Sequence, residues 1–299
     1  MKLRRRSAVL LVVTLSLASL LAAEEAEQPQ VVTTDLGGGL YLLAGIGGNI
    51  AVQVGEHDLQ LVDSGYPGLT EPLHAALAKI STLPVRLLVN THWHFDHIGS
   101  NQAMAATGAT LLAHSSVRDH MSAPQHLAIL ERDVEPAPPL ARPAVTYAGD
   151  LTLHRGDETV DLLHLANAHT DGDTVVRFRQ ADVIHTGDVV FYCGYPFIDV
   201  SHGGTIDGMI AAVEKILAMC SPQTRIIPGH GPLTNAAGLA TYLEMLRSYR
   251  EAVAREVAAG KDLEAIRSGG ATAELDQRWG EVFFPPARFA EAVYRSLPR

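Results

Sequence analysis

Hydrophobic residues along the chain come in short runs that glycine, proline and polar residues separate. In the first third, the runs at residues 40–44, 50–54, 59–62 and 85–89 predict strands joined by glycine-containing turns. Before the last of these strands, residues 69–80 carry apolar side chains at helical spacing, which predicts a helix.

The same alternation of strands and helices continues through the rest of the chain. We expect further strands at residues 109–113, 151–154, 159–165, 174–178, 183–185 and 225–227, and helices at 100–106, 115–121, 206–219, 236–259 and 286–297. Residues 124–143 hold five prolines and mixed charge, which predicts a surface excursion rather than a core element. Two successive blocks of strands and helices predict two sheets sandwiched between helical layers.

The first 23 residues differ from the rest. A basic head precedes an uncharged apolar run at residues 8–21, and Ala22 and Ala23 then give way to acidic residues. This layout is typical of a cleaved secretory signal, and it predicts a periplasmic or secreted protein. The apolar run is short for a membrane span, so we expect no stable membrane association after cleavage, with a retained anchor as the alternative. Residues 24–299 are expected to form a single domain in which residues 236–299 are a helical C-terminal extension.

Charge and cysteine content narrow the class of partner. The full chain carries a net charge of −10, and removing the leader takes away four positive charges and no negative ones, which leaves −14. Such an acidic protein repels phosphate backbones, so we expect a small-molecule substrate and no nucleic acid. Two cysteines, Cys193 and Cys220, are too few for a disulfide scaffold, and we expect two separate thiols. The sequence carries no signal for an oligomeric state.

The densest chemistry lies directly after the expected strand at residues 85–89. His92, His94, Asp96 and His97 place three imidazoles and one carboxylate within six positions. Histidines two residues apart on extended backbone point the same way, and Asp96 and His97 can face the same pocket from the next helix. Nitrogen and oxygen donors without thiolate suit Zn²⁺ and allow an open position for water.

Three more potential ligands, His169, Asp188 and His230, follow other expected strands. Each has glycine within a few residues, which lets the backbone turn and bring the side chain inward. Loops at strand ends would bring these residues to a common edge with the histidine-rich segment.

Taken in order, Asp63, the His92-x-His94-x-Asp96-His97 run, His169, Asp188 and His230 resemble the five motifs of the metallo-β-lactamase-fold superfamily. The resemblance covers residues 63–231. It implies an α/β fold, the αββα four-layer sandwich of that superfamily, here with a helical C-terminal tail.

The resemblance also implies roles for these residues. One zinc ion would be held by His92, His94 and His169, and the other by Asp96, His97 and His230. Asp188 would bridge the two metals, and Asp63 would orient a ligand. The two Zn²⁺, about 3.5–4 Å apart, would share a water and lower its pKa towards ~7, which supplies hydroxide near neutral pH. Asp96 would pass a proton to the leaving group, so Asp96 and Asp188 are the expected catalytic residues.

The aspartate at position 188 separates branches of the superfamily. Some lactamases carry cysteine at this position, whereas glyoxalase II-like thioesterases, lactonases and phosphodiesterase-type members carry aspartate. We therefore expect hydrolysis of an ester, lactone, thioester or β-lactam amide. The donors also accept iron or manganese, which leaves an iron-containing oxygenase or sulfur-oxidising enzyme as an alternative. A non-catalytic metal-binding protein is a further alternative, but it predicts lost ligands and all seven are present.

Aromatic residues after Asp188 are candidates for a substrate pocket. Tyr195, Phe197 and His202 lie close in sequence to the expected metal site. For the aromatic residues, a place in the core is the alternative reading. Trp93 and Phe95, which alternate with the expected ligands, are predicted to pack beneath the site.

Overall fold

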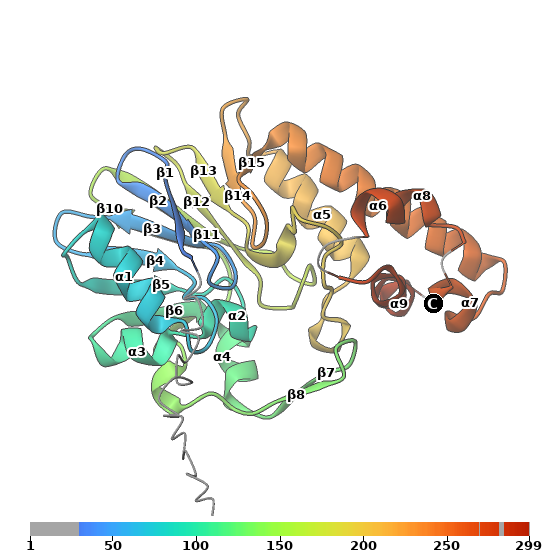
Figure 1. Cartoon of the computed structure of the whole chain (residues 1–299), viewed down its shortest axis with the longest axis horizontal. Coiled ribbons are helices and arrows are strands. Elements are labelled where there is room, and N and C mark those ends of the chain that lie inside the picture. Colours follow the sequence, from blue (N-terminus) through green and yellow to red (C-terminus); the bar gives the residue numbers. More distant parts are fainter. Residues whose placement is uncertain (1–29, 269, 281–283, 299) are drawn as a thin grey trace, which may run out of the picture.

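The computed structural model of the chain describes residues 30–268, 270–280 and 284–298. The expected leader, residues 1–23, lies outside them. Two sheets pack face to face, and helices cover the outer face of each, so the expected four-layer sandwich is confirmed (Figure 1). In the described residues, no helix is both long and apolar enough to cross a membrane.

The first sheet has seven strands, in the spatial order β1-β2-β3-β4-β5-β6-β9. Neighbours from β1 to β4 are antiparallel, and β4, β5, β6 and β9 run parallel. The strands are β1 (Val32–Asp35), β2 (Leu40–Ala44), β3 (Ile50–Val54), β4 (Leu59–Val62), β5 (Val85–Val89), β6 (Thr110–His114) and β9 (Val145–Tyr147). The associated helices are α1 (Thr70–Ile80), α2 (Phe95–Ile98), α3 (Asn101–Ala106) and α4 (Ser115–Ser122).

The second sheet has six strands, β10 to β15, in sequence order. They are β10 (Leu151–Arg155), β11 (Glu158–His164), β12 (Thr174–Phe178), β13 (Val183–His185), β14 (Arg225–Ile227) and β15 (Thr234–Asn235). Because β13 and β14 are parallel and β12 is antiparallel to both β11 and β13, the strands β11, β13 and β14 all run in one direction. Their carboxyl ends therefore meet at one edge of the sheet.

The core is built from residues that alternate between the faces of each strand. In β5, Leu88 packs toward α1 and α3, whereas its neighbour Val89 belongs to the core between the sheets. In β14, Ile227 faces the first sheet and Ile226 packs toward the helices of the other side. Inner strands of both sheets, such as β3 and β12, are thus buried on both faces, which explains why they are rich in apolar residues on both faces.

Helix α5 (Ile206–Leu217), which lies between β13 and β14 in the sequence, and the helices that follow β15 form the helical layer on the outer side of the second sheet (Figure 1). The helices after β15 are α6 (Ala236–Ala258), α7 (Leu263–Arg267), α8 (Ala273–Trp279) and α9 (Pro286–Ser296). The Tyr195 ring lies between this extension and the sandwich: it stacks on Phe289 of α9 with ring centroids 4.6 Å apart and meets Tyr249 of α6 edge-on.

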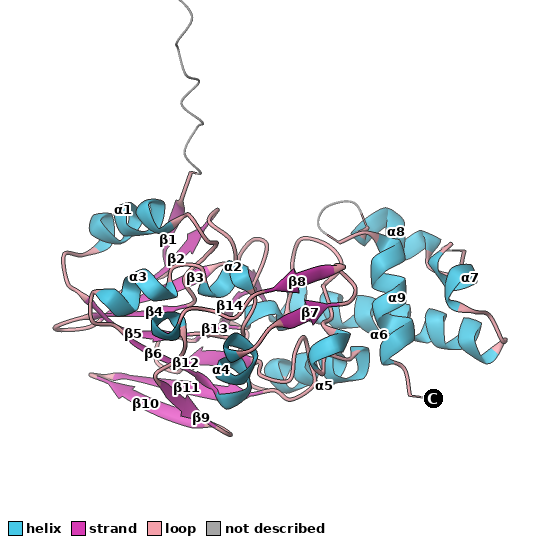
Figure 2. Cartoon of the chain, turned by 90° about the horizontal axis from the view of Figure 1, so that it is seen from below, coloured by secondary structure: helices cyan, strands magenta, loops and turns pink. Residues whose placement is uncertain are grey.

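The expectation that residues 124–143 avoid the core is wrong in part. The segment forms a hairpin of β7 (Gln125–Leu127) and β8 (Arg132–Val134), and then a 3-10 turn at Pro139–Ala141 (Figure 2). Leu127 and Ile129 are buried in the same cluster as α5 and α6. The prolines stand outside the β7–β8 strands, and the apolar residues between them gain enough by burial to dock the hairpin on the protein.

The expected single domain, with the extension included, leads to a stability prediction. Phe289 is fully buried, so Phe289→Ala should destabilise the protein by about 3–5 kcal/mol in one cooperative transition during denaturant unfolding. Val257→Ala, at a position 38% exposed on α6, is the control and should change stability by less than about 0.5 kcal/mol. Two separate transitions, with only one of them shifted by Phe289→Ala, would mean that the extension is a domain of its own.

Candidate metal centre

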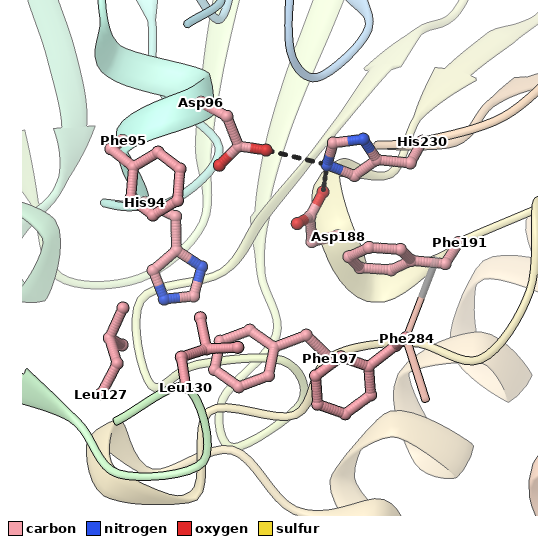
Figure 3. Close-up of a pocket in the computed structure, with 10 residues that line it drawn as sticks. All are labelled: His94, Phe95, Asp96, Leu127, Leu130, Asp188, Phe191, Phe197, His230 and Phe284. Atoms are coloured by element: carbon pink, nitrogen blue, oxygen red, sulfur yellow. Dashed lines mark ion pairs between the residues drawn. The ribbon is translucent and has the colours of Figure 1, made fainter. Parts of the chain in front are cut away.

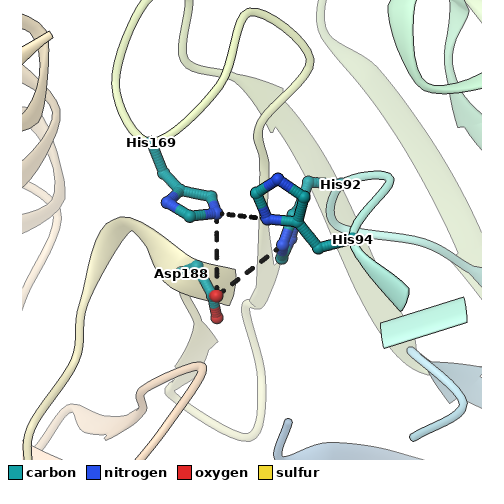
Figure 4. A group of neighbouring side chains, drawn as sticks. All are labelled: His92, His94, His169 and Asp188. Atoms are coloured by element: carbon teal, nitrogen blue, oxygen red, sulfur yellow. Dashed lines mark hydrogen bonds and ion pairs between the residues drawn. The ribbon is translucent and has the colours of Figure 1, made fainter. Parts of the chain in front are cut away.

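Four of the expected ligands come together at the edge where the two sheets meet. His92 and His94 follow β5, His169 follows β11, and Asp188 lies in the turn after β13. One donor atom from each lies within 4.8 Å of all the others, and all four side chains are buried (Figure 4).

The other three expected ligands form a second group beside the first. Asp96 and His97 lie in the short helix α2, and His230 follows β14. The Asp96 carboxylate lies 3.1 Å from His230 Nε2, and Asp188 Oδ1 lies 3.0 Å from His97 Nε2 (Figure 3 shows Asp96, Asp188 and His230). Asp188 therefore stands between the groups, where the sequence places a bridging carboxylate.

Glycines let the loops approach one another closely here. Gly187, just before Asp188, has a φ of +51°, and a side chain there would overlap Thr91. A Cβ on Gly48 would overlap the His97 ring. Asn49 then ties this loop to the turn before His230, because its side-chain amide donates to the Pro228 carbonyl at 2.8 Å.

Hydrogen bonds fix the orientation of two rings through Asp63. His97 Nδ1 donates to the Asp63 carboxylate at 2.7 Å. His92 Nδ1 donates to the Thr91 hydroxyl at 3.0 Å, and that hydroxyl donates to Asp63 at 2.8 Å. Asp63 is buried and has a φ of +66°, and it orients the histidines as the sequence implies. The Nε2 atoms of His92 and His97 are left to face the site.

The other two rings are held in the same manner by different partners. His169 Nδ1 donates to the Phe197 carbonyl at 2.8 Å, and His94 Nε2 donates to the Asp199 carboxylate at 3.0 Å. Since both outward nitrogens carry the proton, the lone pairs of His169 Nε2 and His94 Nδ1 face each other at 2.8 Å. Two facing lone pairs repel unless a cation lies against them, so the geometry fits a metal ion.

Burial and charge set the protonation of the group. Burial, reinforced by neighbouring imidazoles, lowers the pKa of His92 well below its ordinary value and that of His169 to about 4. Burial also lowers the pKa of His230, but the Asp188 and Asp96 carboxylates outweigh it and raise that pKa to about 9. The carboxylates thus attract positive charge to the centre. His92 Nε2 has no hydrogen-bond partner among the described residues, as expected of an atom that binds a metal.

Asp199 is a residue that the sequence reasoning missed. Besides His94, it accepts a hydrogen bond from His202 Nδ1 at 2.8 Å, and it is buried. Two imidazole donors hold the Asp199 pKa low against the opposing effect of burial. The only available signal was a carboxylate two residues after Phe197, and such a pattern is too common to identify a partner for His94.

A cavity of about 220 Å³ opens on the centre. Its walls comprise His94, Phe95, Asp96, Leu127, Leu130, Asp188, Phe191, Phe197, His230 and Phe284 (Figure 3).

The aromatic residues singled out from the sequence have different places. Phe197 lines the cavity, as expected. The expectation is wrong for Tyr195, which is 0% exposed because its ring is packed by Phe289 and its hydroxyl donates to Asp276. It is also wrong for His202, which lies against Trp93 and bonds Asp199 outside the cavity.

Trp93 is buried beside His94, as expected, but Phe95 is a cavity wall rather than a support beneath the site. The backbone turns into α2 at this point, so the Phe95 ring leaves the face that carries Trp93. Cys193 and Cys220 are both free thiols, as expected.

Comparisons with known proteins agree with this geometry. Residues 44–237 match the family model of the metallo-beta-lactamase superfamily. A hydroxyacylglutathione hydrolase of Polaromonas sp. is 29% identical over 163 residues, which are 54% of this chain and 54% of that protein. The chain thus spans about half the length of this relative.

Solved structures share the fold. A metallo-beta-lactamase from Pontibacter korlensis is 19% identical with a TM-score of 0.59, and the BLEG-1 B3 metallo-beta-lactamase is 24% identical with a TM-score of 0.58. Each match covers 73% of this chain and 99% of the other.

The Asp199–His94 contact leads to a prediction about metal affinity. Asp199→Asn keeps the shape but removes the charge that holds the His94 ring, so Zn²⁺ affinity should fall about 10–100-fold in a competition titration with a chromophoric chelator. Asp207→Asn removes a carboxylate that pairs with Arg250 on the surface, and it serves as the control with unchanged affinity. Equal affinities for the two variants would mean that Asp199 has no part in holding the metal ligand.

Proposed function

Because the chain belongs to the metallo-beta-lactamase superfamily, we propose that it is an exported hydrolase that uses two Zn²⁺ ions to cleave an ester, lactone, thioester or β-lactam amide. The observation that carries the proposal is the convergence of seven histidine and aspartate donors in two adjoining groups, four of which line one cavity.

Each group supplies a donor set that suits zinc. His92, His94 and His169 would hold one ion through ring nitrogens, and Asp96, His97 and His230 the other, with Asp188 shared between them. Metal ions bound here would polarise the substrate carbonyl and lower the pKa of a water.

The protein's own side chains complete the chemistry. Although burial opposes it, His97 and His230 hold the pKa of Asp96 below its ordinary value, so this carboxylate is ionised and can accept a proton. Asp96 lines the cavity, where it can return that proton to the leaving group. The phenylalanine and leucine walls exclude bulk water from the reacting groups, which strengthens the electrostatic interactions inside.

Acyl transfer is favoured over phosphoryl transfer by the surroundings. A phosphodiester carries a negative charge, and the described residues that line the cavity include neither lysine nor arginine to pair with it. The similarity to a hydroxyacylglutathione hydrolase, together with aspartate rather than cysteine at position 188, supports an ester or thioester.

The proposal predicts dependence on metal and on the first histidine group. Protein purified without added metal should contain about two zinc ions per chain by elemental analysis, and should lose hydrolysis of p-nitrophenyl acetate on chelation and regain it with Zn²⁺. His94→Ala should remove most hydrolysis and lower the metal content, whereas His74→Ala on α1 should change neither. A stoichiometric iron content would overturn the zinc assignment in favour of an iron enzyme, and full activity of His94→Ala would refute the site.

Export is proposed from the leader alone. The full chain, produced in a Gram-negative bacterium, should be recovered from the periplasm or medium with a mass that lacks about the first 23 residues. A chain that starts at residue 24 should stay in the cytoplasm. Full-length protein retained in the membrane fraction would show instead that the apolar run is an anchor.

A further inference from the structure

The cavity wall has a composition that bears on the substrate. We infer that the site selects a small, uncharged, apolar acyl group, and this inference rests on the proposed hydrolytic function. Of ten lining residues, the four polar ones are all proposed metal ligands. The remaining six are apolar: Phe95, Leu127, Leu130, Phe191, Phe197 and Phe284.

Most of the polar residues and most of the apolar residues occupy different ends of the cavity, with His94 and Phe191 between them. Figure 3 shows Asp96, Asp188 and His230 together at one end, and Leu127, Leu130, Phe197 and Phe284 at the other. A substrate whose carbonyl faces the metal ligands would therefore extend its acyl chain between leucine and phenylalanine side chains.

Contacts behind the walls hold the apolar end in shape. The Phe197 ring lies 5.5 Å from the His94 ring and 5.6 Å from that of Phe284. Phe191 stacks on His230 at 4.8 Å. Since the walls pack on the proposed ligands themselves, the apolar surface is formed before the substrate binds.

A charged group in this end of the cavity would lose its hydration without gaining a partner. Apart from the four proposed metal ligands, the described residues of the lining include no basic side chain and no neutral hydrogen-bonding side chain. The Arg132 guanidinium lies on the Phe95 ring, 3.9 Å from its centroid, and Arg132 is not among the lining residues. Burying a carboxylate without a partner is unfavourable, so an acyl chain that ends in a carboxylate should be rejected.

Two arginines of the C-terminal extension do not supply the missing charge. Arg247 pairs with Glu214 and Arg250 pairs with Asp207, which joins α6 to α5 on the outer helical layer. These two arginines are already paired, and neither lines the cavity. They therefore offer no ion pair to a large anionic thioester. The cavity of about 220 Å³ also suits a short chain or a single ring.

The test compares two esters of equal chain length. For the zinc-loaded full-length protein, kcat/KM for p-nitrophenyl pentanoate should exceed that for mono-p-nitrophenyl glutarate at least ~100-fold, because only the second ends in a carboxylate. Equal values would overturn the inference while leaving hydrolysis established.

Variants of one wall residue locate the selectivity. Leu130→Lys should lower kcat/KM for the pentanoate and raise it for the glutarate, and Leu130→Ala should lower it for the pentanoate. Leu140→Lys, at a surface position 51% exposed, is the matched control and should not change kcat/KM for the pentanoate or for the glutarate. Circular dichroism checks that each variant is folded. If Leu130→Lys is not folded, the kcat/KM of Leu130→Ala for the pentanoate decides whether this wall contacts the acyl chain.

A binding measurement separates this inference from the proposed function. Calorimetry with pentanoic hydroxamic acid and glutaric monohydroxamic acid compares the same two chains without a reaction. If neither ester is hydrolysed but pentanoic hydroxamic acid, whose chain is uncharged, binds at least ~100-fold more tightly than glutaric monohydroxamic acid, the hydrolase proposal fails and the inference stands. If the two hydroxamates bind equally, the inference fails.

Discussion

The organisation of the site follows from one electrostatic constraint: buried carboxylates and buried imidazole lone pairs must face positive charge. Four histidines donate their outer N–H to Thr91, Asp63, Asp199 and a backbone carbonyl, so their other nitrogens converge on a small volume. In that volume, protons on some rings or metal ions must balance the Asp188 carboxylate. Because the site is buried, the attraction of the carboxylate for protons or for metal ions is stronger than it would be in water.

The sandwich meets this constraint by placing strand ends together. Asp63 and His92 follow two parallel strands of the first sheet, and Asp188 and His230 follow two parallel strands of the second. The sheets are joined at this edge by short contacts, such as the hydrogen bond of Asn49 to the turn before His230. The candidate metal ligands are therefore placed by the ends of paired strands and by the loops that these contacts join.

Most of the fold and the ligand set could be predicted from sequence, because strand periodicity and the spacing of histidine and aspartate are local signals. The strands before His92, Asp188 and His230 end where the apolar runs end. The failures concern tertiary contacts. Tyr195 and Phe197 are two residues apart and chemically alike, yet one is fixed in the core by Phe289 and the other lines the cavity. Nothing local distinguishes them, since the distinction arises from α9, some ninety residues later.

This division between strand ends and surrounding elements also separates reactivity from selectivity. The donors that would hold the metals lie on strand ends and on α2, whereas the apolar wall includes Leu127 and Leu130 from the β7–β8 hairpin and Phe284 from the segment just before α9. The hairpin and the extension contribute none of the seven donors. Under the proposed function, substitutions in these two segments would change which acyl group is accepted while the electrostatic balance at the centre stays intact.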